Sequence, residues 1–393
     1  MGDMGAFGEA LRRLQKKRGV TLGGLAELTH YDKGYLSKVS NGVKAASEDV
    51  AQACDKALDA RGELIAAARM DAAAARDARP WETAELVERI QASDSSTRTL
   101  ERLEATVFEL CCQYPSRNAA ELRREAQSWL RHISGILHRP IGLKQHQEFL
   151  VSAGWLALLV GCLEYDLGFQ AGAEATRVAA RQLGEESRHS EILAWSYEMT
   201  AWFALTQGRF ANVVSAAQVG CETDSTHSVR AQLLAQRAKA LARLGDINGV
   251  RKALDAGAHI LSSVPPPDRP EHHFMVDPDK WDFYAMDVYR LAGDSTRAAL
   301  HAREVIAKET LPDGTERAPM RLTEARLTLG VVAARSGQLE EALVYGDQAL
   351  QSARRSLPTL LMVASELDSV LQERYPGDPV AQQFSDRLRE LAA

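Results

Sequence analysis

Residues 21–42 read TLGGLAELTHYDKGYLSKVSNG and predict two short helices joined by a tight turn. Thr21 is suited to cap the first helix, because its hydroxyl can accept a hydrogen bond from a free amide of the first turn. Asp32 can cap the second helix in the same way. Asn41 and Gly42 end that helix, since both residues tolerate the left-handed backbone conformation that a helix terminus needs.

The second helix has two faces of different character. Leu36 and Val39, three residues apart, share the inner face. The outer face carries small and basic side chains, which suit a close approach to DNA because lysine can donate to guanine or phosphate and serine can bond to a base edge. A solvated helix in a small helical bundle is the alternative interpretation of this pattern alone. The outward residues are Lys33, Gly34, Ser37 and Lys38.

The sequences on both sides of this motif favour the DNA-binding interpretation. FGEALRRLQKKRG (7–19) predicts an amphipathic helix with a basic end, and EDVAQACDKALDA (48–60) predicts another that Ser47 can cap. Residues 1–70 hold 11 Lys+Arg against 9 Asp+Glu, whereas the remainder holds 36 against 44. A mildly basic head on an acidic body fits one end that binds DNA and one end that avoids it.

Together these helices resemble the lambda-repressor-like (Xre/Cro) DNA-binding domain over residues 6–68, and LAELTHYDKGYLSKVSNG carries the resemblance. In that family the recognition helix reads bases in the major groove, which implies base or groove contacts for the outward residues. Leu22 stands where many members use glutamine to bind phosphate, and Gly34 offers no side chain for base readout. These departures weaken the case for strong sequence discrimination by this helix alone. The implied phosphate contacts are Tyr35, Asn41 and Lys44.

Length and composition describe an ordinary soluble chain with room for two hydrophobic cores: 393 residues, 45% hydrophobic and 25% charged. No run of about eighteen apolar residues occurs and no secretory signal is recognisable, so we expect a cytoplasmic protein without a membrane partner. The five cysteines lack metal-ligand spacing and are predicted to be reduced core thiols. They are Cys54, Cys111, Cys112, Cys162 and Cys221.

The rest of the chain is predicted to be helical, since no credible strand alternation occurs. The Ala-rich stretch 66–79 predicts a helical linker that Pro80 ends. The predicted divisions are a helix-turn-helix domain at 1–70, a linker at 71–80, connecting helices or atypical N-terminal repeats at 81–149, and a repeat domain at 150–393.

Internal repeats are predicted from residue 150 onward, as helix–turn–helix units that share a turn glycine at spacings of 40, 37, 48 and 44 residues. At the positions where tetratricopeptide helices cross closely, eleven of fifteen residues are Ala or Gly, against about three expected by chance. Residues 150 to about 355 therefore resemble a tetratricopeptide-repeat α-solenoid with capping helices at 358–375 and 379–391. The predicted fold class is all-α. The turn glycines are Gly168, Gly208, Gly245, Gly293 and Gly337.

The resemblance implies that the first helix of each unit lines a concave groove. This lining is aromatic at one end and charged at the other, which suits a peptide or an amphipathic small molecule. Alternatively, several of the aromatic residues pack against neighbouring repeats without touching a ligand. The implied groove residues are Trp155, Tyr165, Asp166, Trp195, Glu198, Trp202, Gln232, Lys239, Arg243, Lys280, Phe283, Asp287 and Arg290.

An irregular insert at 262–284, SSVPPPDRPEHHFMVDPDKWDFY, separates the third and fourth units and could fold over the groove as a lid. His272, His273 and Asp277 raise a metal-binding hypothesis. Adjacent histidines usually diverge, however, and no third strong ligand is evident. We therefore expect neither a metal nor a cofactor.

The architecture resembles the peptide-responsive regulators of Gram-positive bacteria (the RRNPP group) and, more closely, the Xre–tetratricopeptide regulators of actinomycetes. This resemblance implies a transcriptional regulator that is a homodimer, binds a palindromic operator in double-stranded DNA, and holds a peptide, small molecule or partner protein in its repeat domain. The alternative is a tetratricopeptide-repeat interaction adaptor with a weak or vestigial DNA-binding head. No phosphate-binding loop, nucleophile elbow or zinc motif is present, so we expect no enzymatic activity.

Overall fold

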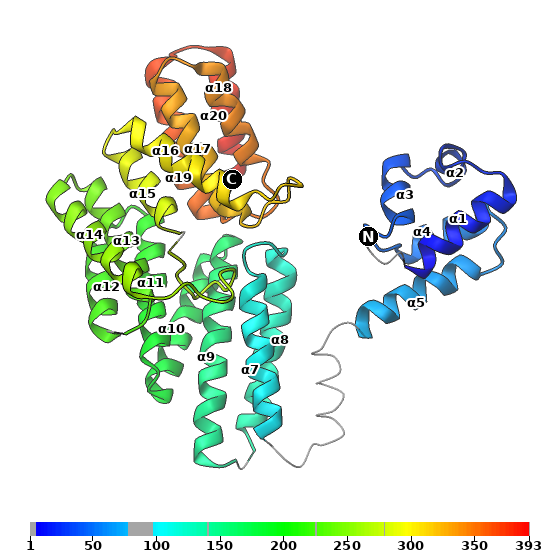
Figure 1. Ribbon diagram of the computed structural model, residues 1–393, viewed down its shortest axis with the longest axis horizontal. Coiled ribbons are helices and arrows are strands. Elements are labelled where there is room, and N and C mark those ends of the chain that lie inside the picture. Colours follow the sequence, from blue (N-terminus) through cyan, green and yellow to red (C-terminus); the bar gives the residue numbers. More distant parts are fainter. Residues whose placement is uncertain (1–4, 78–96, 140, 225, 279, 393) are drawn as a thin grey trace. The chain divides into compact units, whose positions relative to one another are not determined.

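The chain divides into two compact units, Met1–Asp94 and Ser95–Ala393, hereafter the head and the body (Figure 1). The described residues are helical and contain no strand; a single antiparallel bridge joins Thr310 to Glu316. The all-α prediction is confirmed over this part of the chain, whereas residues 78–80 of the predicted linker and 81–96 of the predicted connecting helices lie outside it. The computed structural model describes residues 5–77, 97–139, 141–224, 226–278 and 280–392.

Five helices are described in the head, and the caps of the central pair are those expected from the sequence. Thr21 Oγ1 accepts a hydrogen bond from the amide of Gly24 at 3.1 Å, and Asp32 Oδ1 accepts one from the amide of Tyr35 at 2.9 Å. Leu36 is fully buried in the core that the helices share. The helices are α1 (Ala6–Arg18), α2 (Leu22–Thr29), α3 (Lys33–Ser40), α4 (Glu48–Ala57) and α5 (Glu63–Asp77).

Helix α5 carries the head past the boundary expected at residue 70. The carboxylate of Asp71, which the sequence analysis placed in the linker, accepts hydrogen bonds from the amides of Ala6 and Phe7 at 2.6 and 2.9 Å. Those amides open α1 and have no acceptor within their own helix. Asp71 therefore caps α1 from a distant part of the sequence, a contact that the weak amphipathic pattern of this stretch does not reveal.

The body is built from helices that pack in antiparallel pairs and stack side by side (Figure 1). The pairs are α9 with α10, α11 with α12, α13 with α14, α15 with α16, and α17 with α18. The body helices are α7 (Thr97–Gln113), α8 (Ala119–Leu137), α9 (Leu143–Asp166), α10 (Gln170–Ser187), α11 (Ser190–Thr206), α12 (Phe210–Thr223), α13 (Val229–Arg243), α14 (Ile247–Ser263), α15 (Lys280–Leu291), α16 (Ser295–Glu309), α17 (Pro319–Arg335), α18 (Leu339–Leu350), α19 (Leu357–Arg374) and α20 (Pro379–Ala392).

Glycines set both the turns and the close crossings of these pairs. All five predicted turn glycines have φ between 72° and 84°, the left-handed region that glycine enters without strain. At the crossings, a Cβ on Gly161 would lie 2.7 Å from Met199 and one on Gly220 would lie 2.8 Å from Leu233. The small residues that the repeat pattern singled out therefore allow neighbouring helices to approach.

Residues 358–375 were predicted to form a helix that caps the end of the stacked pairs. Helix α19 occupies this position and makes further contacts. It packs on α17, and it also contacts α9 and α11 near the other end. Two hydrogen bonds hold this return: Arg354, just before α19, donates to Asp166 at 2.8 Å, and Trp202 Nε1 donates to Thr359 at 3.0 Å. Part of the expected groove is consequently filled by the chain's own C-terminal segment.

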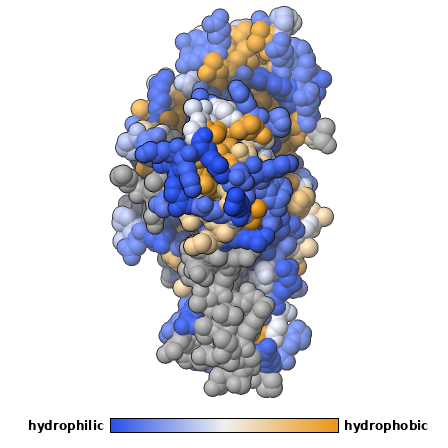
Figure 2. Space-filling model, turned by 90° about the vertical axis from the view of Figure 1, so that its right-hand side faces the viewer, coloured by the Kyte–Doolittle hydropathy of each residue, from blue (hydrophilic) through white to orange (hydrophobic). Residues whose placement is uncertain are grey.

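Helix α9 is the one helix among the described residues that is long and apolar enough to cross a membrane. Of its most apolar window, 78% is buried inside the body, so these side chains serve as core. Among the residues coloured in Figure 2, hydrophilic side chains predominate, with apolar patches between them.

Candidate nucleic-acid interface and interior cavity

Helix α3 presents the outer face that its sequence predicts. Leu36 and Val39 are buried in the head, whereas the small and basic residues point outward. Tyr35 and Ser37 are half-buried. The exposed residues among the predicted contacts are Lys33, Gly34, Lys38, Asn41 and Lys44.

The position of α3 is fixed by a close approach to α1. A Cβ on Gly8 would lie 2.6 Å from the carbonyl oxygen of Ser40, so the two backbones meet with no room for a side chain. The guanidinium of Arg12 donates to that same carbonyl at 2.8 Å and to the Ser40 hydroxyl at 3.3 Å. A helix held in this way keeps its outward face in a fixed orientation, which groove recognition requires.

Replacing Gly8 by alanine should therefore destabilise the head by roughly 1–3 kcal/mol, because the new methyl group meets a backbone carbonyl that cannot rotate away. Hydrogen exchange of the α3 amides in the full-length protein measures the loss. Gly23→Ala is the matched control: its Cβ would meet only Thr21 Oγ1, at 3.8 Å, so it should be neutral or slightly stabilising. Equal exchange in both variants would contradict the close approach of α1 and α3.

The three predicted phosphate contacts are also engaged within the head. Asn41 accepts a hydrogen bond from Arg12 and donates to Ser37 at 3.4 Å, and the Nζ of Lys44 lies 4.8 Å from the centroid of the Tyr35 ring. These contacts orient the side chains and leave Lys44 exposed. Arg12 joins the candidate interface through this network; the sequence showed only that it belongs to a basic helix end.

The cap of α3 explains why position 34, on the outer face of the helix, is a glycine. A Cβ at this position would lie 3.0 Å from Oδ1 of Asp32, the atom that caps α3. A side chain here would crowd the cap. Leu22, the other departure from the family pattern, packs against the core of the head.

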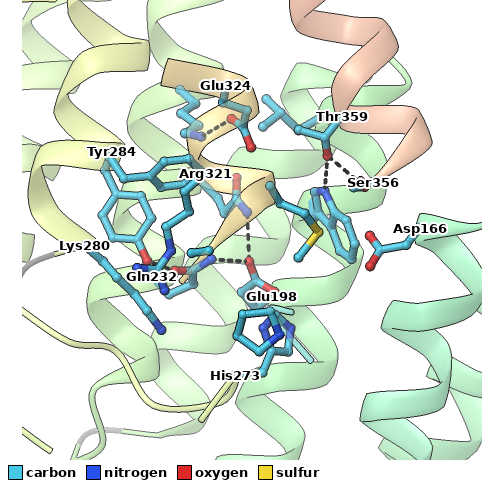
Figure 3. A pocket seen from close by; sticks show the side chains of 18 of the residues that line it. Asp166, Glu198, Gln232, His273, Lys280, Tyr284, Arg321, Glu324, Ser356 and Thr359 are labelled. Atoms are coloured by element: carbon cyan, nitrogen blue, oxygen red, sulfur yellow. Dashed lines mark hydrogen bonds and ion pairs between the residues drawn. The ribbon is translucent and has the colours of Figure 1, made fainter. Parts of the chain in front are cut away.

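The body contains a cavity of about 150 Å³ between α11, α13, α15, α17 and the start of α19 (Figure 3). Its wall combines aromatic rings with carboxylate, amide and ammonium groups. The lining residues are Tyr114, Pro115, Asp166, Trp195, Glu198, Trp202, Leu205, Gln232, Gln236, Lys239, His273, Lys280, Phe283, Tyr284, Ala318, Met320, Arg321, Glu324, Ser356, Thr359 and Met362.

The structure separates the predicted groove residues into two groups. Those that line the cavity are Trp195, Glu198, Trp202, Gln232, Lys239 and Phe283, together with Asp166 and Lys280. Those that lie away from it are Trp155, Tyr165, Arg243, Asp287 and Arg290. The residues of the second group make contacts within the protein; for Trp155 and Tyr165 this is the alternative that the sequence left open.

The two aromatic residues of the second group pack against other parts of the protein: Tyr165 is buried and Trp155 is half-buried. The Tyr165 ring stacks on Phe203 with centroids 3.8 Å apart, and its hydroxyl bonds to Thr206 at 2.5 Å. The Trp155 ring lies 5.4 Å from that of Phe274, which belongs to the insert. Burial by a partner far along the chain explains why their helical position alone could not exclude a ligand role.

The charged residues of the second group hold α19 in place. Arg290, fully buried, pairs with Asp287 on its own helix and donates to Glu366 of α19 at 2.7 Å. Arg243 of α13 donates to the same carboxylate at 3.0 Å and lies 3.6 Å from Asp287. Burial raises the pKa of Asp287, but the surrounding guanidinium and ammonium groups lower it by more than burial raises it. The pKa therefore lies below its ordinary value, and the carboxyl stays ionised.

The insert forms a wall of the cavity. The amide of His273 donates to the carbonyl of Cys111 at 3.2 Å, and its ring lies 3.7 Å from that of Tyr114. Burial lowers the pKa of His272 to about 4 and that of His273 well below its ordinary value. Over the described parts of the chain no cluster of three potential metal ligands is found.

Burial shifts the pKa of charged groups at the cavity towards neutral pH. Glu198 accepts hydrogen bonds from the amides of Gln232 and Gln236 at 2.9 and 2.8 Å, yet burial raises its pKa. Burial also raises the pKa of Glu324 to about 7 and lowers that of Lys280 to about 7. Groups of this kind respond to the charge of a bound molecule, which is typical of functional sites.

Part of this lining was not predicted from the sequence. Arg321 and Glu324 lie in α17, the first helix of the last pair. Glu324 stands as far before its turn glycine, Gly337, as Trp195, Gln232 and Lys280 stand before theirs, so the same offset would have found it, whereas Arg321 lies one turn outside the offsets used. Tyr114 lies in the turn that follows α7, and Thr359 lies in α19. Both positions are outside the repeating pattern. No local signal marks those two.

Comparison with known proteins supports the assignment of the head. Residues 6–68 match a family described as a helix-turn-helix domain. These are the residues over which the sequence resembles a DNA-binding domain. No curated protein matches the chain. The match and the outward face of α3 support a DNA-binding regulator.

Proposed function

We propose that this protein is a cytoplasmic, homodimeric transcriptional regulator of the Xre type, of the kind found in actinomycetes, whose operator binding is controlled by a ligand held in a tetratricopeptide-like body. The observation that carries this proposal is the outward, basic face of α3 in a head that matches a helix-turn-helix family. A helix of this kind enters the major groove, and its dimer symmetry matches a palindromic operator.

Three features of the body support the repeat assignment. Its helices pack as stacked pairs, each pair turns at a left-handed glycine, and small residues stand where helices cross. In such stacks every unit contacts its neighbours, so a change at one site can spread along the row. The cavity between the first helices of the pairs is the natural place for a ligand.

The proposed control is a shift between two arrangements of the protein. A ligand changes DNA affinity only if it binds one arrangement better than the other. Helix α19 is suited to couple the two events, because Thr359 and Met362 line the cavity while Glu366 bonds to Arg243 and Arg290 outside it. Filling the cavity would thus act directly on a helix that joins both ends of the body.

The test is a comparison of the full-length protein on DNA from its own promoter region and on random DNA of equal length. At about 0.15 M salt we expect promoter DNA to be preferred by about a thousandfold. Equal affinity for both DNAs would overturn the proposal. Half-site mapping of a bound promoter should show two sites about 34–36 Å apart, or a multiple of that spacing, if the protein binds as a dimer.

The adaptor remains the second candidate because Leu22 packs against the core of the head and offers no polar side chain to phosphate. An adaptor would retain partner binding when its α3 lysines are removed and would show no DNA-dependent effect. The lysine variants described in the Discussion separate the two functions.

A further inference from the structure

The cationic side chains at the cavity already have acceptors within the protein. The Nζ of Lys239 lies 3.7 Å from a carboxylate oxygen of Asp287. Lys280 donates to a backbone carbonyl of the insert, and Arg321 pairs with Glu309. An anionic ligand would have to compete with each of these contacts.

The acceptors at the cavity are in surplus. Oε1 of Gln236 and Oε2 of Glu324 have no hydrogen-bond partner, although these residues are only 7% and 8% exposed. The cation nearest to Glu324 Oε2 is Lys239, with its Nζ 4.0 Å away. Buried acceptors are normally satisfied, so a molecule that brings N–H donors would complete this site.

The size and the walls of the cavity restrict the rest of that molecule. A volume of about 150 Å³ is that of an engineered protein cavity known to hold benzene, and it is smaller than the roughly 300 Å³ of the smallest pockets for drug-sized ligands. Trp195, Trp202 and Phe283 supply aromatic faces and edges around it. A molecule with a single ring fits this volume.

We propose that this cavity binds a small arylalkylamine, with its ammonium group donating to Glu324 and Gln236 near Glu198 and its ring lying among Trp195, Trp202 and Phe283. This inference rests on the proposed function, because it names the chemistry of the ligand that the regulator senses. A ligand of this class supplies the missing donors and leaves Lys280 and Arg321 with their acceptors. Lys239, whose Nζ lies 4.0 Å from Glu324 Oε2, would share that carboxylate with the ligand and keep its contact with Asp287.

The pKa values of two cavity residues predict how amine binding depends on pH. Glu324 binds an ammonium ion best when it is ionised, and its pKa of about 7 means that it gains charge as the pH rises through neutrality. Lys280, with a pKa of about 7, loses its repulsive charge over the same interval. Amine affinity should therefore rise between about pH 6 and about pH 8. The other charged groups around Glu324 are Lys239 and Arg243 of α13, Asp287 and Arg290 of α15, and, beyond Arg290, Glu366 of α19.

Phenethylamine and 3-phenylpropionate form a matched pair of probes, with the same ring and opposite charges. Added to the full-length protein, phenethylamine should change tryptophan fluorescence and give a calorimetric binding signal that 3-phenylpropionate does not give. Tighter binding of the carboxylate, or binding of neither probe at about 10 mM, the weak limit for so small a molecule, would overturn the inference.

Variants locate the binding. Glu324→Gln and, separately, Glu198→Gln keep the side-chain shape and should each weaken phenethylamine binding about tenfold or more. Glu341→Gln, an exposed carboxylate on α18, is the control and should leave the affinity unchanged. Unchanged affinity in both cavity variants would place the amine elsewhere and overturn the assignment.

The DNA assay keeps this inference separate from the function on which it rests. If promoter DNA is preferred but neither probe binds, the regulator stands and the ligand class is wrong. If phenethylamine binds in the cavity but promoter and random DNA are bound equally, the ligand class stands and the regulatory function is wrong.

Discussion

Replacing both Lys33 and Lys38 by alanine should weaken promoter binding by about a hundredfold, because both side chains are exposed on the outer face of α3. If the two ammonium groups contact phosphates, the slope of log affinity against log salt should fall by about 2. Fluorescence anisotropy of labelled promoter DNA at several salt concentrations measures both quantities. The readout separates a contact with the backbone from a contact with bases, since only the first reduces the slope uniformly on all sequences.

Lys56→Ala combined with Arg61→Ala removes the same charge from exposed positions of the head outside α3. We expect this control to change the affinity by less than about threefold at 0.15 M salt, where distant charges are screened. An equal loss in the two double variants would mean that total charge, not the face of α3, determines binding. An unchanged affinity in Lys33→Ala/Lys38→Ala would favour the adaptor.

Replacing Asp287 by asparagine should reduce the unfolding free energy of the body by about 3 kcal/mol. The reason is that Arg290, Arg243 and Lys239 converge on this fully buried carboxylate and would lose their shared counterion. Because the pKa of Asp287 lies below its usual value of 3.8, its contribution is present above that pH and is lost as the pH falls further.

Urea unfolding followed by tryptophan fluorescence measures this loss, since five of the six tryptophans lie in the body. Asp386→Asn is the control, because Asp386 pairs with Arg389 on the surface and exposed pairs contribute at most about 1 kcal/mol. Equal unfolding midpoints for the two variants would show that the buried network does not hold α19 in place.

The two predictions bear on the two ends of the proposed mechanism. The lysines test the contact with DNA, and Asp287 tests the network that holds α19 beside the cavity. A ligand that fills the cavity touches Thr359 and Met362 of the same helix. Loosening α19 by mutation should therefore also weaken ligand binding, whereas the lysine variants should not.

The sequence alone determined the features that depend on residues within one or two helical turns. Thr21 and Asp32 cap the helices they were expected to cap, and Leu36 and Val39 point inward because periodicity within one helix fixes its buried face. The turn glycines were found because a left-handed turn restricts the residue type strongly and recurs along the chain.

Only the tertiary structure decided which groove residues are free to meet a ligand. Trp202 and Thr359 are 157 residues apart, and Arg354 bonds to Asp166 across an even longer stretch. Neither contact can be predicted from local sequence. The periodicity of a helix shows which of its faces is buried, but not which distant segment packs against that face. The cavity is the space between the helix pairs that α19 and the insert leave unfilled. Its extent depends on how segments far apart in the sequence pack together.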